Sequence, residues 1–160
     1  MRRASQGAGR RNKGSSGERE AAGKLQDLLG IRFERVLTQA RDGGSDLAAV
    51  GYPAWPCACE VKRRASPVDA SEWRRWHAQA TAASRPDRHP VVLYRWDRQA
   101  WRASVPMALI AEAVGGDDTV PGWFDCSLET FAMLAREVMA RRAETGEPMH
   151  AEGVSQDVPA

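Results

Sequence analysis

The 160-residue sequence has no run of 18 apolar residues, so we expect no transmembrane helix and no membrane partner. The basic first residues are not followed by an apolar segment, which argues against a secretory signal. There are only 3 Cys, an odd number, so a disulfide scaffold is not expected. Together these features predict one globular domain in the cytoplasm.

Lysine is also scarce, because only three of the 23 basic residues are Lys: Lys13, Lys24 and Lys62. A lysine at a position suited to catalysis is therefore stronger evidence for a functional role than it would be in an average sequence. Charge is divided unevenly along the chain. Residues 1–111 carry 20 basic and 11 acidic side chains, a net of +9, whereas residues 112–160 carry 3 and 10, a net of −7. A basic body favours a polyanionic partner such as nucleic acid, although it also suits an ordinary solvated surface.

Both ends of the chain lack a hydrophobic period. Residues 1–16 are basic and rich in Gly and Ser, which predicts a disordered arm, and residues 143–160 predict a disordered acidic tail. The single domain is expected between them, over residues 17–142.

Within this domain the apolar pattern alternates between helical and strand periods, which predicts an α/β fold. The first three strands should form an antiparallel meander, and residues 115–126 should form a loop. Helices are expected over 17–29, 69–84, 106–114 and from 128 to at least 138, and strands over 31–37, 45–50, 57–62, 91–94 and 101–105.

Candidate catalytic side chains lie on the third expected strand, residues 57–62. Because side chains on a strand alternate between faces, Glu60 and Lys62 share one face, while Cys57 and Cys59 point to the apolar side. Asp46 opens the neighbouring strand and can reach the same end of that face. Two nearby carboxylates repel each other unless a cation lies between them, and their hard oxygens suit Mg²⁺. A lysine beside such a cation can orient water or stabilise negative charge, which is what hydrolysis of a phosphodiester requires.

The order Asp…Glu-x-Lys on a helix–meander–helix framework resembles the PD-(D/E)xK nuclease superfamily. Residues 14–20 (GSSGERE) are similar to the G-x-x-x-E-R-E opening of the first helix in archaeal Holliday junction resolvases and related phage nucleases. The helix with Trp73, Trp76 and Gln79, and the strand after it, are also similar to the phage members. The resemblance covers about residues 12–105 and departs from the pattern where Ser45 replaces Pro.

This resemblance implies a restriction-endonuclease-like core with C-terminal helices, and a homodimeric DNA endonuclease that uses Mg²⁺ or Mn²⁺ and acts on branched DNA such as a Holliday junction. The positions that match the superfamily's catalytic set are Glu18, Asp46, Glu60, Lys62 and Gln79. The implied metal ligands are Glu18, Asp46, Glu60 and the main-chain carbonyl of Val61.

Basic and aromatic side chains near this set are candidate contacts with DNA. Trp55 lies in a loop between two prolines, so we expect it to contact nucleic acid or a second subunit, whereas Trp76 should lie in the core. The candidate phosphate contacts are Arg11, Lys13, Arg19, Arg41, Arg63 and Arg64.

Other interpretations remain open at this point. Glu60 and Lys62 could form a surface ion pair while Asp46 caps a turn. The function could be that of a non-catalytic DNA-binding accessory protein on a nuclease-like fold, or of a flap, nick or restriction-like nuclease. Zinc is disfavoured because the spacing of the cysteines and histidines fits no common finger, and residues 17–24 lack the spacing of a phosphate loop.

Overall fold

The computed structural model describes residues 5–37, 44–117 and 120–146, with side chains from residue 14 onward. None of the described helices is long and apolar enough to cross a bilayer. The elements, in chain order, are α1 (Ser5–Leu29), β1 (Phe33–Arg35), β2 (Leu47–Ala49), β3 (Cys57–Arg64), α3 (Ala70–Ala83), β4 (His89–Trp96), β5 (Arg102–Pro106), α4 (Met107–Val114), β6 (Trp123–Ser127) and α5 (Leu128–Thr145).

The strands form one mixed sheet in the order β1-β2-β3-β4-β5-β6. β1, β2 and β3 are antiparallel neighbours, so the predicted meander is confirmed. β3 and β4 are parallel, and α3 supplies the crossover connection that a parallel pair needs. β4, β5 and β6 are again antiparallel. This is the α/β, restriction-endonuclease-like architecture expected from the sequence.

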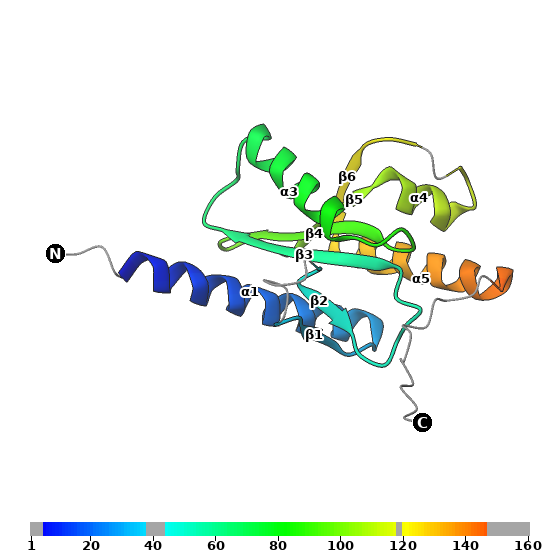
Figure 1. Ribbon diagram of the computed structural model, residues 1–160, viewed down its shortest axis with the longest axis horizontal. Coiled ribbons are helices and arrows are strands. Elements are labelled where there is room, and N and C mark those ends of the chain that lie inside the picture. Colours follow the sequence, from blue (N-terminus) through cyan, green and yellow to red (C-terminus); the bar gives the residue numbers. More distant parts are fainter. Residues whose placement is uncertain (1–4, 38–43, 118–119, 147–160) are drawn as a thin grey trace, which may run out of the picture.

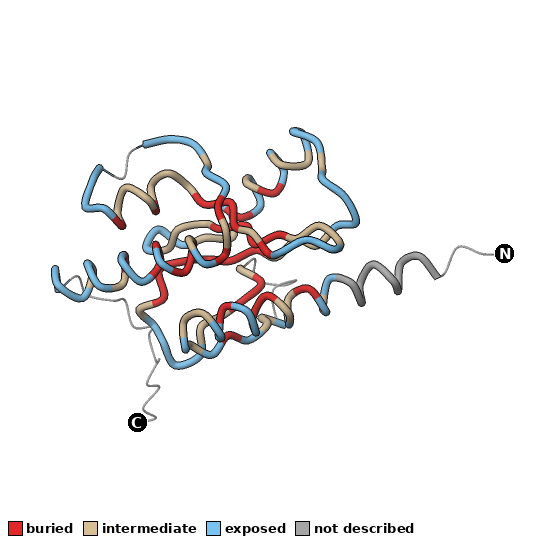
Figure 2. The backbone as a smooth tube through the Cα atoms, turned by 180° about the vertical axis from the view of Figure 1, so that it is seen from behind, coloured by how far each residue is buried: buried red, intermediate tan, exposed pale blue. Residues whose placement is uncertain are grey.

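Helices cover both faces of the sheet (Figure 1). α1 and α5 lie along one face, and α3 crosses the other. The larger core joins the sheet to α1, α4 and α5, with Leu25, Leu93 and Phe131 among its buried side chains. The smaller core lies under α3 around Trp76 and Val92. In Figure 2 the buried segments follow the central strands, so β3 and β4 are enclosed by both layers.

α1 is longer at its start than the sequence pattern predicts. It begins at Ser5, so the expectation of a disordered arm is wrong for residues 5–16, while residues 1–4 lie outside the described part. A helix that packing has already nucleated is extended at little cost, which accounts for the longer helix although the three Gly and three Ser of residues 5–16 are poor helix formers. α1 packs closely on β3 at Gly17, where an added Cβ would lie in van der Waals contact, 3.4 Å from the Cβ of Arg63. The proposed limits of the domain remain predictions.

β6 is a strand that the sequence analysis missed, because residues 115–126 were expected to form a loop. It pairs with β5 from Arg102↔Ser127 to Pro106↔Trp123. Two successive residues of β6, Phe124 and Asp125, are exposed. β6 therefore lacks the alternation of buried and exposed residues that is typical of a half-buried strand. α5 then continues to Thr145, into the segment predicted as tail, and ends at Gly146 with a left-handed φ of 64°.

Trp55 lies in the core instead of contacting a partner. Only 2% of this residue is exposed. Its ring meets Phe33 edge-on at 4.9 Å and Phe131 at 6.0 Å. The prediction that Trp55 contacts DNA or a second subunit is therefore wrong, because burying so large an apolar ring is worth more than exposing it in a loop. The prediction that Trp76 is buried is confirmed.

Candidate active site

Glu60 is the buried centre of the candidate site, with 1% of its surface exposed. It lies in the middle of β3 and faces α3, while its neighbour Cys59 enters the larger core on the opposite face. The ammonium of Lys62, two residues further on, lies 3.4 Å from a carboxylate oxygen of Glu60. An exposed ion pair kept for solubility would not place its carboxylate in the interior, so the surface interpretation does not hold.

Gln79 of α3 connects these two charged side chains. Lys62 Nζ donates to Gln79 Oε1 at 2.8 Å, and Gln79 Nε2 donates to Glu60 Oε2 at 3.0 Å. One amide therefore accepts from the lysine and donates to the carboxylate, which fixes both side chains relative to each other. The sequence analysis placed Gln79 near this pair, and the structure brings the three together.

Asp46 lies directly before β2 and beside the same part of β3. Its main-chain N–H donates to the carbonyl of Cys59 at 2.9 Å, and its Oδ2 accepts from the main-chain N–H of Val61 at 2.6 Å. This pair of bonds holds the carboxylate against β3 at the level of Glu60. Asp46 is itself largely buried. Strand pairing, and not a local turn, therefore positions the aspartate.

The electrostatics of the site favour a bound cation. Burial and the nearby Asp46 raise the pKa of Glu60 from 4.5 to about 7, although Lys62 opposes the rise. Two carboxylates share a desolvated space, and one ammonium compensates only part of their charge. The side-chain donors are the hard oxygens of two carboxylates, and the resemblance implies the carbonyl of Val61 as a further donor. Such a set fits Mg²⁺ or Mn²⁺, which bind one or two carboxylates and retain several waters.

Glu18 has a different neighbour from the one implied by the resemblance. Its carboxylate accepts from Arg35 Nε of β1, so in the structure it forms an ion pair between α1 and the sheet. Across the described residues, no group of three or more His, Cys, Asp or Glu side chains is placed to hold a metal. The role of Glu18 as a ligand therefore remains a prediction, and its partner Arg35 is a residue that the sequence analysis missed.

The candidate phosphate contacts fall into separate groups. Arg63 points away from Lys62 and is held between α1 and the sheet, 3.7 Å from Glu20 and 3.6 Å from Asp97. Arg64 shares the face of Lys62, and its guanidinium lies 5.4 Å from the ring of Trp76.

Three of the remaining four candidates belong to α1. Arg19 is exposed on α1. Arg11 and Lys13 lie on the first turns of α1, but their side chains are outside the described part, as is the whole of Arg41. Of the six candidates, Arg64 and Arg19 are therefore the two that the structure places at the surface.

Comparison with known proteins decides the family. Residues 9–120 match the family described as "Phage putative PDDEXK endonuclease". The chain belongs to this family. A solved structure, that of Archaeoglobus fulgidus Hjc, a Holliday junction resolvase from an archaeal hyperthermophile, is similar over 57% of this chain and 74% of that one, with 21% identity and a TM-score of 0.39. A comparison with curated proteins gives no match.

Proposed function

We propose that this PDDEXK endonuclease hydrolyses DNA phosphodiester bonds with Mg²⁺ or Mn²⁺, and that branched DNA is its preferred substrate. The observation that carries the proposal is the buried arrangement of Asp46 and Glu60 with Lys62 and Gln79. Buried carboxylates held close together with one ammonium cost stability, and a purely structural role would not require them. The same groups are the ones that phosphodiester hydrolysis needs.

Each side chain has a distinct proposed role. Asp46, Glu60 and the carbonyl of Val61 would hold the metal ion. When bound, a divalent ion polarises the phosphoryl oxygen and lowers the pKa of a water molecule. Lys62 would orient the attacking water and stabilise the negative charge that develops on the phosphate. Glu18 would join the ligands by exchanging Arg35 for the metal.

Gln79 is proposed as a positioning residue. Its amide oxygen holds the ammonium of Lys62, and its amide nitrogen holds the carboxylate of Glu60. A flexible four-carbon lysine chain is thereby kept in one orientation before the substrate arrives. Such preorganisation matters because a misplaced group loses much of its effect on the transition state.

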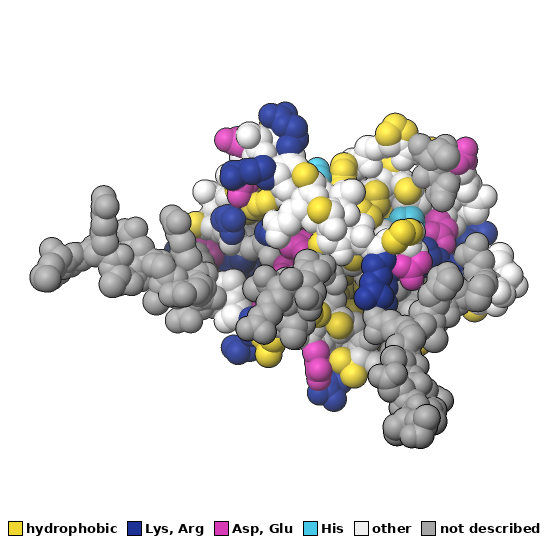
Figure 3. Space-filling view, viewed as in Figure 1, with side chains coloured by type: hydrophobic (Ala, Val, Ile, Leu, Met, Phe, Trp, Pro, Cys, Tyr) yellow, Lys and Arg dark blue, Asp and Glu magenta, His cyan; other side chains and the backbone are white. Residues whose placement is uncertain are grey.

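Preference for branched DNA and a homodimeric state are the finer parts of the proposal. They rest on the likeness of residues 14–20 to the first helix of resolvases, and on the symmetry of a four-way junction, which presents two equivalent cuts. Exposed basic side chains over α3, visible in Figure 3, would contact the phosphates of DNA arms; Arg74 and Arg75 belong to them. With Trp55 buried, the exposed Val50 and Tyr52 near the β1 edge are the better candidates for a subunit contact.

The test uses labelled four-way junction and linear duplex of matched sequence, each with Mg²⁺ and with EDTA. Lys62→Ala should reduce cleavage at least 100-fold. Lys24→Ala is the matched control, because Lys24 is another of the three lysines but is exposed on α1. Symmetric, metal-dependent cuts in the junction alone would support the full proposal.

Other outcomes separate the alternatives. Equal cutting of junction and duplex would retain the nuclease and refute the preference for branched DNA. Binding without cleavage in Mg²⁺ or Mn²⁺ would refute the enzyme and favour a DNA-binding accessory protein. Cleavage that survives Lys62→Ala would refute the role proposed for that lysine.

A further inference from the structure

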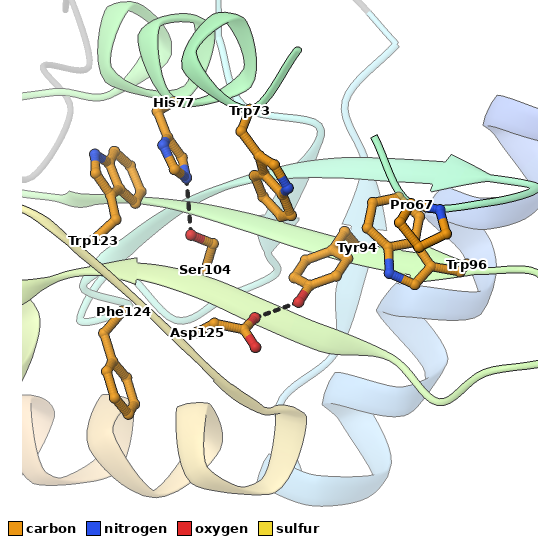
Figure 4. A pocket seen from close by; sticks show the side chains of 9 residues that line it. All are labelled: Pro67, Trp73, His77, Tyr94, Trp96, Ser104, Trp123, Phe124 and Asp125. Carbon is orange, nitrogen blue, oxygen red and sulfur yellow. Dashed lines mark hydrogen bonds between the residues drawn. The ribbon is translucent and has the colours of Figure 1, made fainter. Parts of the chain in front are cut away.

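The face of the sheet that α3 covers also carries an open pocket of about 440 Å³ (Figure 4). The pocket lies between α3 and the strands β5 and β6. This volume is in the range of pockets that bind small ligands. The roles proposed above for the catalytic set do not use it. Its lining residues are Pro67, Trp73, His77, Tyr94, Trp96, Ser104, Trp123, Phe124 and Asp125.

Aromatic rings from three elements form the walls. The ring of Trp73 on α3 lies 4.8 Å from that of Tyr94 and 6.1 Å from that of Trp96, with both pairs nearly perpendicular. At the other end, Trp123 of β6 stacks on His77, with centroids 4.0 Å apart and planes at 6°. Trp73, Trp96 and Trp123 are only partly buried, so part of each ring borders the open space, where planar groups can stack on it.

The polar groups of the pocket include a hydrogen-bond acceptor, the carboxylate of Asp125. Tyr94 donates its hydroxyl to Asp125, and the other carboxylate oxygen of Asp125 accepts from Arg102 at 2.6 and 3.0 Å. About half of the Asp125 side chain is exposed, and a carboxylate has sites for further donors. It would accept an N–H group. The ring nitrogen of His77 lies 2.9 Å from the hydroxyl of Ser104, which fixes that wall.

The pocket and the candidate active site are on the same face of the sheet. Lys62 is the register partner of Tyr94, and Arg64 is the partner of Trp96. α3 separates the two, with Gln79 toward Lys62 on one flank and Trp73 toward the pocket on the other. A helix with its side chains is about 10–12 Å wide. A nucleotide bound in the pocket would therefore be only a few nucleotides along the DNA strand from the phosphate at Lys62.

We propose that this aromatic pocket binds one unpaired nucleobase of the DNA substrate, stacked on the rings and hydrogen-bonded through its N–H groups to Asp125. This inference rests on the proposed DNA nuclease function. The exposed Arg74 and Arg75 on the outer side of α3 would hold the phosphates that connect the base to the cut strand.

The proposal also gives a physical reason for preferring branched DNA. Bases inside a duplex must be unpaired and unstacked before they can enter a pocket, and this cost is smallest where pairing is already interrupted. A branch point or bulge supplies such a base. Stacking is tolerant of sequence because every base has an aromatic face, so the pocket would recognise structure instead of sequence.

The experiment measures binding of three labelled duplexes by fluorescence anisotropy: one with a single bulged cytosine, one with an abasic bulge, and one without a bulge. Lys62→Ala protein is used so that no DNA is cut. The cytosine bulge should bind at least about fivefold more tightly than the abasic bulge. Trp123→Leu and, separately, Trp96→Leu should remove most of this difference.

Met133→Leu is the control. Met133 is an exposed apolar residue of α5, on the opposite face of the sheet from α3 and the pocket (Figure 1), so the cytosine preference should be unchanged. Melting temperatures establish that each variant is folded. Fluorescence of 2-aminopurine in the bulge reports stacking with the Trp residues intact, and it should decrease on binding.

Equal affinity for cytosine and abasic bulges, with no change in 2-aminopurine fluorescence, would overturn the pocket proposal. If wild-type protein still cuts junctions with Mg²⁺, the nuclease function survives that result. Failure to bind or cut any of the DNA substrates would overturn both proposals.

Discussion

Replacing Glu60 with Gln should stabilise the metal-free protein while abolishing its nuclease activity. Glutamine has nearly the same shape and can retain the bond from Gln79, but it carries no charge. In the wild-type protein at pH 8 the ionised Glu60 is buried beside Asp46. The substitution removes this unfavourable charge together with one proposed metal ligand.

The size of the expected stabilisation follows from the pKa of Glu60. Glu60 has a pKa of about 7 in the folded protein, against an ordinary value of 4.5. Ionising it in the fold therefore costs about 3 kcal/mol at pH 8. Loss of the 3.4 Å contact with Lys62 offsets part of the gain, so the free energy of unfolding should rise by about 1–3 kcal/mol. The melting temperature should rise by roughly 2–12 °C.

The effect should depend on pH in a defined direction. Because the folded pKa is raised, the folded state retains a proton that the unfolded state has lost between pH 4.5 and 7. The wild-type protein therefore loses stability as pH rises through this window, and Glu60→Gln does not share this loss. The two proteins should have similar stability at pH 4.5 and differ most at pH 8.

The assay is urea or thermal unfolding in EDTA, followed by circular dichroism, over pH 4.5–8. Glu34→Gln is the control, because Glu34 is an exposed carboxylate paired with Arg32, and its change should stay within about 0.5 kcal/mol. Mg²⁺ should raise the melting temperature of the wild type more than that of Glu60→Gln. A Glu60→Gln protein that is less stable at pH 8, or a difference that does not vary with pH, would refute the reasoning.

Two further predictions concern the core. Trp55→Ala should destabilise the protein by about 3–5 kcal/mol in urea unfolding, because the ring is enclosed by Phe33 and Phe131; a loss below 1 kcal/mol would show that Trp55 is not packed there. The thiols of Cys57, Cys59 and Cys126 are buried, and burial raises the pKa of each, that of Cys126 to about 11. All three should therefore react with a disulfide reagent at pH 8 far more slowly in the native protein than in urea, and fast labelling of the native protein would contradict this burial.

The elements closest to the site could be predicted because their local signals agree with their tertiary environment. From Cys59 to Lys62, β3 alternates between apolar and charged side chains, and α3 begins after Asp69, whose side chain caps the helix by accepting from the N–H of Glu72. β6 could not be predicted in this way. Its residues form a strand because β5 offers an open edge to pair with, and that edge exists only once β5 has paired with β4.

The same division holds for individual side chains. The common face of Glu60 and Lys62 follows from the period of two along a strand, and the placement of Asp46 follows from the meander. The partner of Glu18 was not predictable, because Arg35 reaches it only after β1 lies alongside α1. The exposure of Trp55 was predicted wrongly, because a loop with prolines gives no local sign that its aromatic ring turns into a core built from β1 and α5.

The sequence by itself determined the α/β class, the order of the meander and the helix that follows it, and the set of acids and lysine that indicates a nuclease. These properties depend on short-range periodicity and on residue chemistry, which are written along the chain. Tertiary structure decided the burial of Glu60, the ring of bonds through Gln79, the ion pairs of Glu18 and Arg63, and the aromatic pocket beside α3. Those properties depend on side chains from distant segments that meet only when the sheet and its two helical layers close around them.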